Sequence, residues 1–302
     1  MLSNKQVNRI GDILKNNEHN DSEENIKILI DFRNQFVDPL FGLSLKIKNL
    51  LNESKFSFIL SGRLKRLKSI IRKLRREQNR HMDLTRMADI AGIRIIVEDI
   101  SQQESIFEFL KDKLNVSKIF DYRERDQNYK SLHFHVVDES EKTIEIQLRT
   151  LGQHTWADES ESFGEQSKEN TGSKELLEFF SLLSNSLYRL ERGESFDEPS
   201  NEYFKKRDPI NDKYVYLKEN FKKKSIETKK NIQDYIFIIV FDNKTKTITY
   251  NENFNLNETS SAIDEHKRLS SYLDDRRYEY LFMSSDSIDA LKLTHPRFFY
   301  KN

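Results

Sequence analysis

The sequence predicts an α+β protein, because segments with the two-residue period of β-strands alternate with segments of helical spacing. Two amphipathic strands at 130–138 and 142–150 are joined by a short Glu/Ser turn, which predicts an antiparallel hairpin. The residues after 234 give a β-β-α-β-α order, which is typical of a small α+β module. With 302 residues, of which 36% are hydrophobic, the chain can bury one large core or two modest ones.

The first part of the chain is predicted to be mainly helical, with four strands, of which the last two form the hairpin. Ser22 can cap the first helix, and Pro39 is expected to end or kink it, because proline has no backbone N–H to donate. In chain order the predicted elements are helices over 22–38 and 40–53, a strand over 56–60, a helix over 63–80, a strand over 92–99, a helix over 101–114, the two hairpin strands, and a helix over 173–192.

A break in this pattern predicts a domain boundary. Residues 193–213 lose the apolar periodicity and contain two of the four prolines. We therefore expect a first domain over 1–195, a linker over 196–213 and a small α+β module over 214–302. Within that module the predicted elements are a charged helix to about 230, strands over 235–242, 246–252 and 278–284, and helices over 258–274 and from Ser285.

The composition excludes several classes of function. The chain has no cysteine, which rules out disulfides, thiol catalysis and cysteine-ligated metal sites. Its formal net charge is zero, so attraction to nucleic acid or to a membrane would need a local patch. No apolar run reaches the length of a membrane span and the first residues lack a signal-peptide core, so we expect a cytoplasmic protein.

One segment concentrates positive charge within this neutral chain. RLKRLKSIIRKLRR, residues 63–76, contains eight basic residues and no acidic one. It fits either a solvated basic helix face or a clamp for a polyanion, in which arginines bind phosphates in a bidentate way. The local concentration of charge favours the phosphate clamp.

Two acidic residues are candidates for chemistry. In the strand TIEIQLRT, the polar residues Glu145, Gln147 and Arg149 share one face, which meets either solvent or a binding site. Asp89 precedes an apolar strand containing Arg94, and a charge within a buried strand needs a partner. If Asp89 and Glu145 converge, the two carboxylates can hold a Mg²⁺ ion that neutralises a transferring phosphoryl group.

A third candidate group lies in NYKSLHFHV. Tyr129 directly precedes a strand and is either a surface tyrosine or a platform on which a nucleobase stacks. Lys130 follows it. His133 is better suited to donate a hydrogen bond to a phosphate than to bind zinc, because His133 and His135 have no third ligand near them in the sequence. No histidine is followed directly by aspartate, so the sequence shows no His-Asp metal-dependent phosphohydrolase site.

Four of these segments, in this order and spacing, resemble the RelA/SpoT-type nucleotide pyrophosphokinases, the alarmone synthetases. The matching stretches are GRLKRLKSIIRKL (62–74), MADIAGIRIIV (87–97), NYKSLHFHV (128–136) and IEIQLRTLGQHTWADESE (144–161). The resemblance covers roughly residues 25–192. It implies a mixed-sheet, nucleotidyltransferase-like synthetase core flanked by helices. The ending FMSSDSIDALKLTHPRFFYKN resembles that of a larger branch without a hydrolase domain, in agreement with the missing His-Asp pair.

The resemblance implies transfer of the β,γ-pyrophosphate of ATP to the 3′-hydroxyl of GDP or GTP, with Mg²⁺ as cofactor. In that reaction Asp89 would bind Mg²⁺, and Glu145 would help to hold the ion or deprotonate the hydroxyl. Arg63 and Arg94 would sandwich the adenine and reach the phosphates. The other implied contacts are Lys65, Ser69 and Lys73 with the ATP phosphates, Tyr129 with the acceptor base, Lys130 and His133 near the phosphates, and Gln147, Arg149 and His154 in the acceptor pocket.

Two positions depart from the family's pattern, both on the acceptor side. The usual glycine before the stacking tyrosine is Asn128, a residue that tolerates positive φ. Where small synthetases carry a Glu-His pair after the tryptophan, this chain has Ser160 and Glu161. We expect Glu161 to take an acceptor-side role.

Two other functions remain open from the sequence. A related toxic enzyme would pyrophosphorylate the 3′-CCA end of tRNA, and the basic residues of 204–230 could offer it a surface outside the cleft. A non-enzymatic nucleotide-binding module is the third reading, and the presence of Asp89, Glu145 and Tyr129 argues against it.

The C-terminal module is expected to regulate rather than to catalyse. Its aromatic residues lack a set of groups that could carry chemistry, and most of them are expected to pack in a core. We expect this module to act as a neutraliser or as a sensor for a protein trigger. The resemblance also implies a homo-oligomer, because small synthetases of this family often self-associate.

Overall fold

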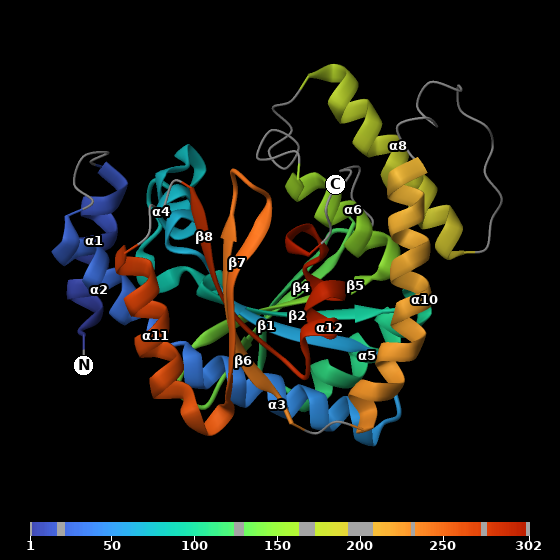
Figure 1. The fold of residues 1–302 in the computed structure, drawn as a ribbon, viewed down its shortest axis with the longest axis horizontal. Coiled ribbons are helices and arrows are strands. Elements are labelled where there is room, and N and C mark those ends of the chain that lie inside the picture. The colour runs from blue at the N-terminus through green and yellow to red at the C-terminus, as the bar shows by residue number, and fades with distance from the viewer. Residues whose placement is uncertain are drawn as a thin grey trace.

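The computed structural model describes residues 2–16, 22–123, 130–162, 173–192, 208–230, 233–272 and 277–299. Helices and strands alternate along these residues, so the predicted α+β class is confirmed (Figure 1). The described helices are α1 (Asn4–Asn16), α2 (Glu23–Asn34), α3 (Val37–Glu53), α4 (Leu67–Arg75), α5 (Ile100–Lys113), α6 (Leu151–Ser162), α8 (Lys174–Glu191), α10 (Asp208–Lys230), α11 (Thr259–Tyr272) and α12 (Ile288–Thr294). The strands are β1 (Ile59–Leu64), β2 (Ala91–Val97), β3 (Val116–Asp121), β4 (Leu132–Val137), β5 (Thr143–Thr150), β6 (Tyr235–Asp242), β7 (Thr247–Asn255) and β8 (Tyr278–Ser285).

The strands form one mixed sheet in the order β3-β4-β5-β2-β1-β8-β6-β7. β2 and β5 run parallel, whereas the other neighbouring pairs are antiparallel, including the predicted β4–β5 hairpin. The pairing of β1 with β8 joins the C-terminal strands to the N-terminal ones. The strands predicted within 214–302 therefore extend the N-terminal sheet and do not form a sheet of their own.

The predicted domain boundary lies mostly outside the described residues. The structure does not describe residues 193–207, and α10 begins at Asp208, inside the predicted linker of 196–213. Although its sequence is strongly charged, α10 packs an apolar stripe against the cluster formed by α6 and α8. The residues of this stripe are Tyr214, Leu217 and Phe221.

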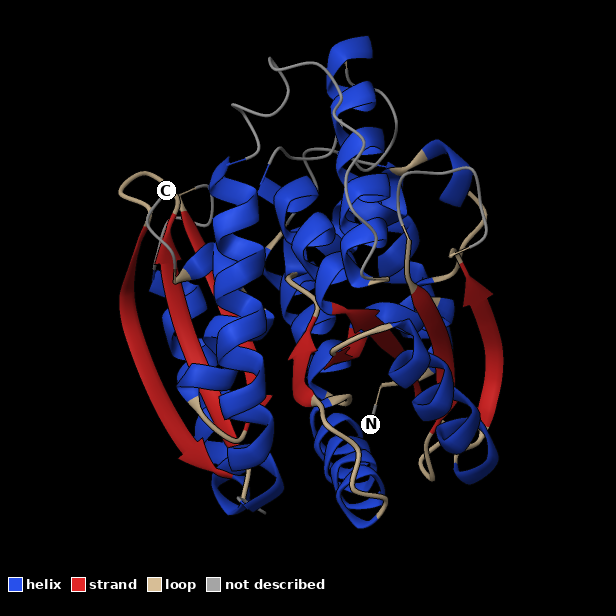
Figure 2. Ribbon diagram, turned by 90° about the vertical axis from the view of Figure 1, so that its right-hand side faces the viewer, coloured by secondary structure: helices blue, strands red, loops and turns tan. Residues whose placement is uncertain are grey.

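Helices cover both faces of the twisted sheet (Figure 2). One face carries α1 to α5 and α11, which form the largest buried cluster together with Ile93, Ile95 and Ile146. The opposite face carries α6, α8, α10 and α12 over two smaller clusters, one that includes Ile59 and Ile96 and one that includes β6 and β8. Polar residues of β1, β2 and β5 lie between these two clusters and mark the candidate site. No described helix is long and apolar enough to cross a membrane.

Two predicted boundaries are wrong, each for a physical reason. The helix predicted over 63–80 is shorter, because β1 continues to Leu64 and α4 begins only at Leu67. The segment LSGRLK alternates polar and apolar residues, which is the strand period. α3 begins at Val37 and holds Pro39 in its first turn, where the missing N–H of proline costs no helical hydrogen bond. Helix α1 and strand β3 are not among the predicted elements.

A buried ion pair connects the N-terminal helices to the C-terminal strands. Lys48 Nζ, on α3, lies 2.5 Å from Asp234 Oδ1, which directly precedes β6, and both side chains are buried. Burial raises the pKa of Asp234, while the charge of Lys48 and its hydrogen bond oppose that rise. Each charge depends on the other, because an unpaired charge in this position would carry its desolvation cost alone.

We expect Lys48→Met to lower the free energy of unfolding by about 3 to 5 kcal/mol, because it leaves the Asp234 carboxylate buried without its partner. The double variant Lys48→Met/Asp234→Leu should recover most of this loss, since it removes both charges. Urea unfolding at neutral pH measures both values. This account of the pair would be contradicted if the double variant lost as much free energy of unfolding as Lys48→Met and Asp234→Leu lose together.

Candidate active site

The candidate site begins with two rows of polar residues that cross three neighbouring strands. In the first row, Arg63 on β1 pairs with Gly92 on β2, which pairs with Glu145 on β5. In the second row, Ser61 pairs with Arg94, which pairs with Gln147. Because side chains two residues apart on a strand point to the same side, both rows face one surface of the sheet.

These rows line a cavity of about 40 Å³. Gly92 leaves room in its floor, because it places no side chain between the two flanking strands. Asp89 and Glu145, which are far apart in the sequence, both line this one cavity. Its lining residues are Ser61, Arg63, Lys65, Asp89, Gly92, Ile93, Arg94, Glu145, Gln147 and His295.

Asp89 stands between two lysines at one end of the cavity. It lies in a 3₁₀ turn that leads into β2, and its Oδ2 is 3.0 Å from Lys65 Nζ and 2.8 Å from Lys73 Nζ. Burial opposes its ionisation, but the charges of the two lysines outweigh burial and hold the pKa of Asp89 below its usual value. Its other oxygen, Oδ1, is buried and has no hydrogen-bond partner among the described residues. That oxygen is available to a ligand.

Glu145 is held in its ionised form by its neighbours. Its Oε1 lies 3.3 Å from His133 Nδ1, and its Oε2 accepts a hydrogen bond of 2.8 Å from Gln147 Nε2. Burial would raise the pKa of Glu145, but the charge and hydrogen bond of His133, the hydrogen bond of Gln147 and the charge of Lys73 bring it well below its usual value. At neutral pH this carboxylate is therefore a weak base and a good ligand for a cation.

Arginines occupy the other end of the cavity. Arg94 is buried, and its Nη1 donates a hydrogen bond to the carbonyl of Thr294. Burial, followed by the charges of Arg149 and Arg63, lowers the pKa of Arg94 to about 9, so it stays positive at neutral pH. Arg63 is only half-buried, which leaves its guanidinium able to turn toward a ligand. The cavity therefore runs from Asp89 with its two lysines, past the row of Arg63 and Glu145, to the row of Arg94.

Some sequence-predicted residues touch the cavity only through others. Lys73 reaches it by its ion pair with Asp89, and His133 by its contact with Glu145. Arg149 is buried on the same face of β5, one step beyond Gln147, and does not line the cavity. Tyr129 and Asn128 lie outside the described residues.

The remaining predicted residues lie away from the cavity lining. Ser69 is in the first turn of α4 and half-buried. Lys130 lines a second, smaller cavity of about 10 Å³ beside α6 and α8. His154 is buried in α6, and its Nε2 donates a hydrogen bond of 2.9 Å to the carbonyl of Leu293. Glu161, at the end of α6, lies 3.7 Å from Arg297.

Residues of the C-terminal segment complete the site, and sequence reasoning did not single them out. His295 lines the cavity, while Arg297 contacts both Glu161 and Glu279 of β8. Arg66 also pairs with Glu279, so the cationic loop after β1 is tied to β8. The sequence could have indicated Ser61, because it alternates with Arg63 on one face of the same strand. No local pattern marks His295, because its place depends on the pairing of β1 with β8.

The turn from β5 into α6 is anchored by Glu191 of α8. Its carboxylate accepts hydrogen bonds from Thr150 Oγ1 at 2.8 Å and from the backbone N–H of Gly152 at 2.6 Å. A Cβ at Gly152 would meet this carboxylate at 2.8 Å, so only glycine allows so close an approach. Burial raises the pKa of Glu191 to about 7.

The fold and the cavity define a class of protein: an α+β protein whose mixed sheet carries a cationic cavity with two carboxylates, suited to a phosphorylated ligand. Residues 62–164 match the protein family described as "Region found in RelA / SpoT proteins". The matched region contains every cavity-lining residue from Arg63 to Gln147.

The chain is also similar to individual proteins. GTP pyrophosphokinase YjbM of Bacillus subtilis (strain 168) is 30% identical over 117 residues, which cover 35% of this chain and 55% of that protein. The chain thus spans about half the length of this relative. The small alarmone synthetase 1 of Bacillus subtilis, bound to its product pppGpp, gives a TM-score of 0.48 at 24% identity over 55% of this chain and 94% of that chain. A GTP pyrophosphokinase family protein from Streptococcus pneumoniae gives 0.47 at 20% identity, over 62% and 96%.

We expect stability to fall as pH rises through the range from 4.5 to about 7, because Glu191 keeps its proton in the folded protein and loses it in the unfolded chain. The free energy of unfolding should fall by roughly 1 to 3 kcal/mol over this pH range. Glu191→Gln should flatten this part of the pH profile of the free energy of unfolding. Glu178→Gln, an exposed change on the same helix, should leave the profile as it is; an unchanged profile in Glu191→Gln would contradict the assignment.

Proposed function

We propose that the protein is an ATP-dependent pyrophosphokinase that transfers the β,γ-pyrophosphate of ATP to the 3′-hydroxyl of GDP or GTP, making (p)ppGpp. The observation that carries this proposal is the cavity in which Asp89 and Glu145 face Lys65, Arg63 and Arg94. Transfer of a phosphoryl group depends on positioning and on neutralising charge, and this cavity supplies both. The match to a relative named GTP pyrophosphokinase supports the choice of acceptor.

The residues present fit a Mg²⁺ ion. Mg²⁺ is bound in such sites by one or two carboxylates together with substrate phosphates, and it keeps several waters. Asp89 brings a buried, unpartnered Oδ1, and Glu145 brings an ionised carboxylate into the same cavity. The described residues hold no group of three or more His, Asp or Glu that could bind a metal without substrate. Bound there, the ion would neutralise charge on the triphosphate.

The side chains around the carboxylates can bind and orient the donor. Lys65 and Lys73, now paired with Asp89, are placed to contact the phosphates of ATP, and Ser69 lies on the same helix as Lys73. Arg63 and Arg94 would hold the adenine, since guanidinium planes stack on bases. Because Glu145 is a weak base, we assign it to holding the ion and to orienting His133 and Gln147, rather than to taking the proton of the hydroxyl.

The acceptor is proposed to bind beyond Glu145 on β4 and β5. Gln147 lines the cavity there, and His133 lies beside it across the two strands. The proposed acceptor contacts are Tyr129, Lys130, His133, Gln147, Arg149, His154 and Glu161. Of these, His154 and Glu161 are engaged by the C-terminal segment, so their part in binding is the least direct.

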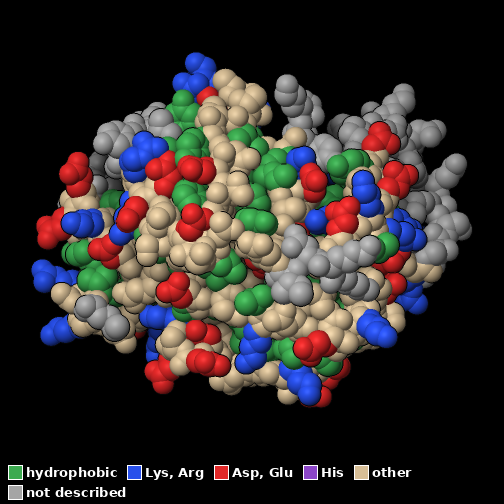
Figure 3. Space-filling view, turned by 60° about the horizontal axis from the view of Figure 1, so that its bottom comes forward, with side chains coloured by type: hydrophobic (Ala, Val, Ile, Leu, Met, Phe, Trp, Pro, Cys, Tyr) green, Lys and Arg blue, Asp and Glu red, His purple; other side chains and the backbone are tan. Residues whose placement is uncertain are grey.

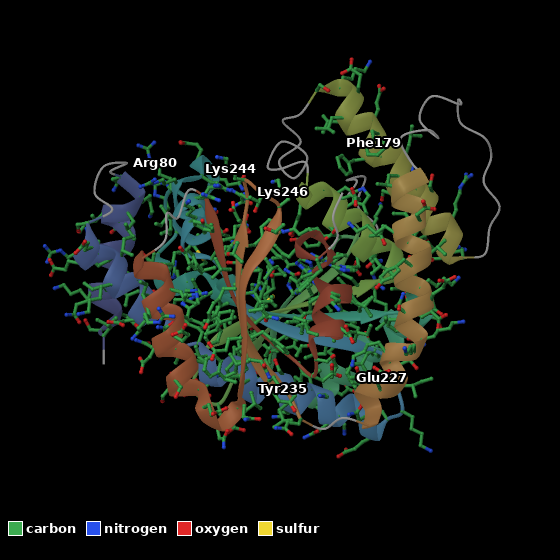
Figure 4. The ribbon with its side chains drawn as sticks, viewed as in Figure 1. Arg80, Phe179, Glu227, Tyr235, Lys244 and Lys246 are labelled. Carbon is green, nitrogen blue, oxygen red and sulfur yellow. The ribbon has the colours of Figure 1, made fainter. Side chains whose placement is uncertain are left out.

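Transfer of the pyrophosphate of ATP to the 3′-CCA end of tRNA is the alternative. Arg80, Lys244 and Lys246 are exposed and come from distant parts of the chain, yet they lie along one edge of the molecule in the view of Figure 4. They offer positive charge outside the cavity, as a tRNA enzyme requires. The face in Figure 3 shows basic and acidic side chains intermixed, without a large basic patch. We favour the nucleotide as acceptor because the named relative is a GTP pyrophosphokinase.

The C-terminal elements are proposed to regulate the site through direct contact. A protein trigger or a neutralising contact acting on β8 or α12 would reach Arg63 and Arg94 through the β1–β8 pairing and through Thr294. We also propose a homo-oligomer. Because ATP and guanine nucleotides are cytoplasmic solutes, the proposed reaction takes place in the cytoplasm.

With ATP labelled at the γ-phosphate and Mg²⁺, we expect label to appear in a product of GDP or GTP and not in tRNA. Thin-layer separation of nucleotides and gel separation of tRNA measure the two outcomes. Label on tRNA alone would establish the alternative acceptor and overturn the proposal of (p)ppGpp synthesis.

Asp89→Asn and Glu145→Gln should each lower kcat at least about a hundredfold, since each removes one charge that would hold the cation. Glu108→Gln, an exposed change on α5, is the matched control and should keep the wild-type rate. Thermal unfolding of each variant shows whether the fold is retained. A folded Glu145→Gln enzyme with the wild-type rate would contradict the assignment of this carboxylate.

A further inference from the structure

The C-terminal end of α12 and the segment that follows it form a wall of the cavity. The carbonyl of Thr294 accepts a hydrogen bond from Arg94, and the carbonyl of Leu293 accepts one from His154. On either side of this segment, Leu291 and Phe298 are buried in the cluster formed with β6 and β8. Displacing the segment would expose these apolar side chains to water, so it is part of the site rather than a plug that leaves it.

Within this wall, the contacts of His295 favour one tautomer. The Oγ1 of Thr294 lies 3.0 Å from the carbonyl of Ala290 and 3.0 Å from His295 Nδ1. Both hydrogen bonds form only when the hydroxyl donates to the carbonyl and Nδ1 donates to the hydroxyl; with the ring proton on Nε2, one of the two is lost. His295 Nδ1 therefore carries the ring proton, and Nε2 is an acceptor. Burial, and then the charges of Arg94 and Arg63, lower the pKa of His295 well below its usual value, so the ring stays neutral.

The acceptor atom of His295 is buried and unsatisfied. The side chain is 3% exposed, and Nε2 has no hydrogen-bond partner within the described part of the chain. The guanidinium groups of Arg94 and Arg63 lie nearby, but neither donates to Nε2, and Arg94 Nε is itself buried without a partner among the described residues. A buried acceptor without a donor costs about 1 to 3 kcal/mol, which a ligand that supplies an N–H would recover.

His295 belongs to the end of the cavity that is remote from Asp89. Its charged neighbours are Arg94, Arg63 and Glu161, whereas Asp89 pairs with Lys65 and Lys73. From the level of Lys65 to that of Ser61 and Arg94 there are two side-chain steps along β1, or roughly 13 Å. This span suits a nucleoside triphosphate whose phosphates lie at Asp89 and whose base lies near His295.

We infer that His295 Nε2 accepts a hydrogen bond from the amino group of the donor's adenine and so selects ATP over a purine nucleotide with an oxygen at that position. The inference rests on the proposed function for the orientation of the donor. Because the cavity is only about 40 Å³, entry of the base would require the half-buried Arg63 side chain to move, as it also would to stack on the adenine. A guanine oxygen facing Nε2 would place two hydrogen-bond acceptors against each other. The single ring proton of neutral His295 is on Nδ1 and could not lie between them.

The test compares ATP with purine riboside triphosphate, which lacks the amino group. We expect the wild-type protein to bind ATP about 5 to 30 times more tightly than this analogue in calorimetric titrations with Mg²⁺. His295→Asn keeps a donor for Thr294 but loses the Nε2 acceptor, so it should bind both nucleotides equally. His295→Gln retains an acceptor near the Nε2 position and should keep most of the preference.

Equal wild-type affinities for the two nucleotides would overturn the inference, and so would an unchanged preference in His295→Asn. Tighter ATP binding by His295→Asn would also overturn it, because the ring would then obstruct the site. The wild-type comparison needs no variant, so a variant that fails to fold leaves the test intact. Binding is measured without an acceptor; ATP selectivity without pyrophosphate transfer would therefore sink the proposed function and leave His295 as the base-selecting residue.

Discussion

The site depends on strand β1 being paired on both sides. Its partner β2 brings Arg94 and the turn with Asp89, and through β2 the parallel strand β5 brings Glu145. Its other partner, β8, holds the C-terminal segment in place beside Arg63. Without either pairing, one wall of the cavity would be lost. Backbone hydrogen bonds thus decide where the charges stand, and the charges then decide what the cavity can bind.

The two carboxylates in the cavity are compensated before any ligand arrives. Lys65 and Lys73 balance Asp89, and His133 and Gln147 hold the charge of Glu145. Such a network tolerates burial because each ionised group has a partner. A phosphorylated ligand with its cation can exchange partners with these groups without leaving any of them unpaired, which keeps the cost of opening the network small.

Much of the fold follows from local pattern, and the part that does not is non-local. Period-two alternation predicts the β4–β5 hairpin and places Glu145 and Gln147 on one face, because each strand reports its own periodicity. The secondary structure of the basic segment 63–76 was predicted less well. Its leucines have helical spacing, so the end of the strand that carries Arg63 was assigned to a helix. The joining of β8 to β1, and with it the place of His295, depends on contacts between residues more than 200 positions apart, which no local pattern contains.

The pairing of β1 with β8 also has a consequence for biosynthesis. Residues 59–64 leave the ribosome long before residues 278–285, so the carboxylates and lysines can assemble while one edge of β1 is still bare. Contacts between such distant segments form slowly because a long loop must close first. A nascent chain therefore lacks the wall of the cavity that contains His295 until β8 has docked on β1.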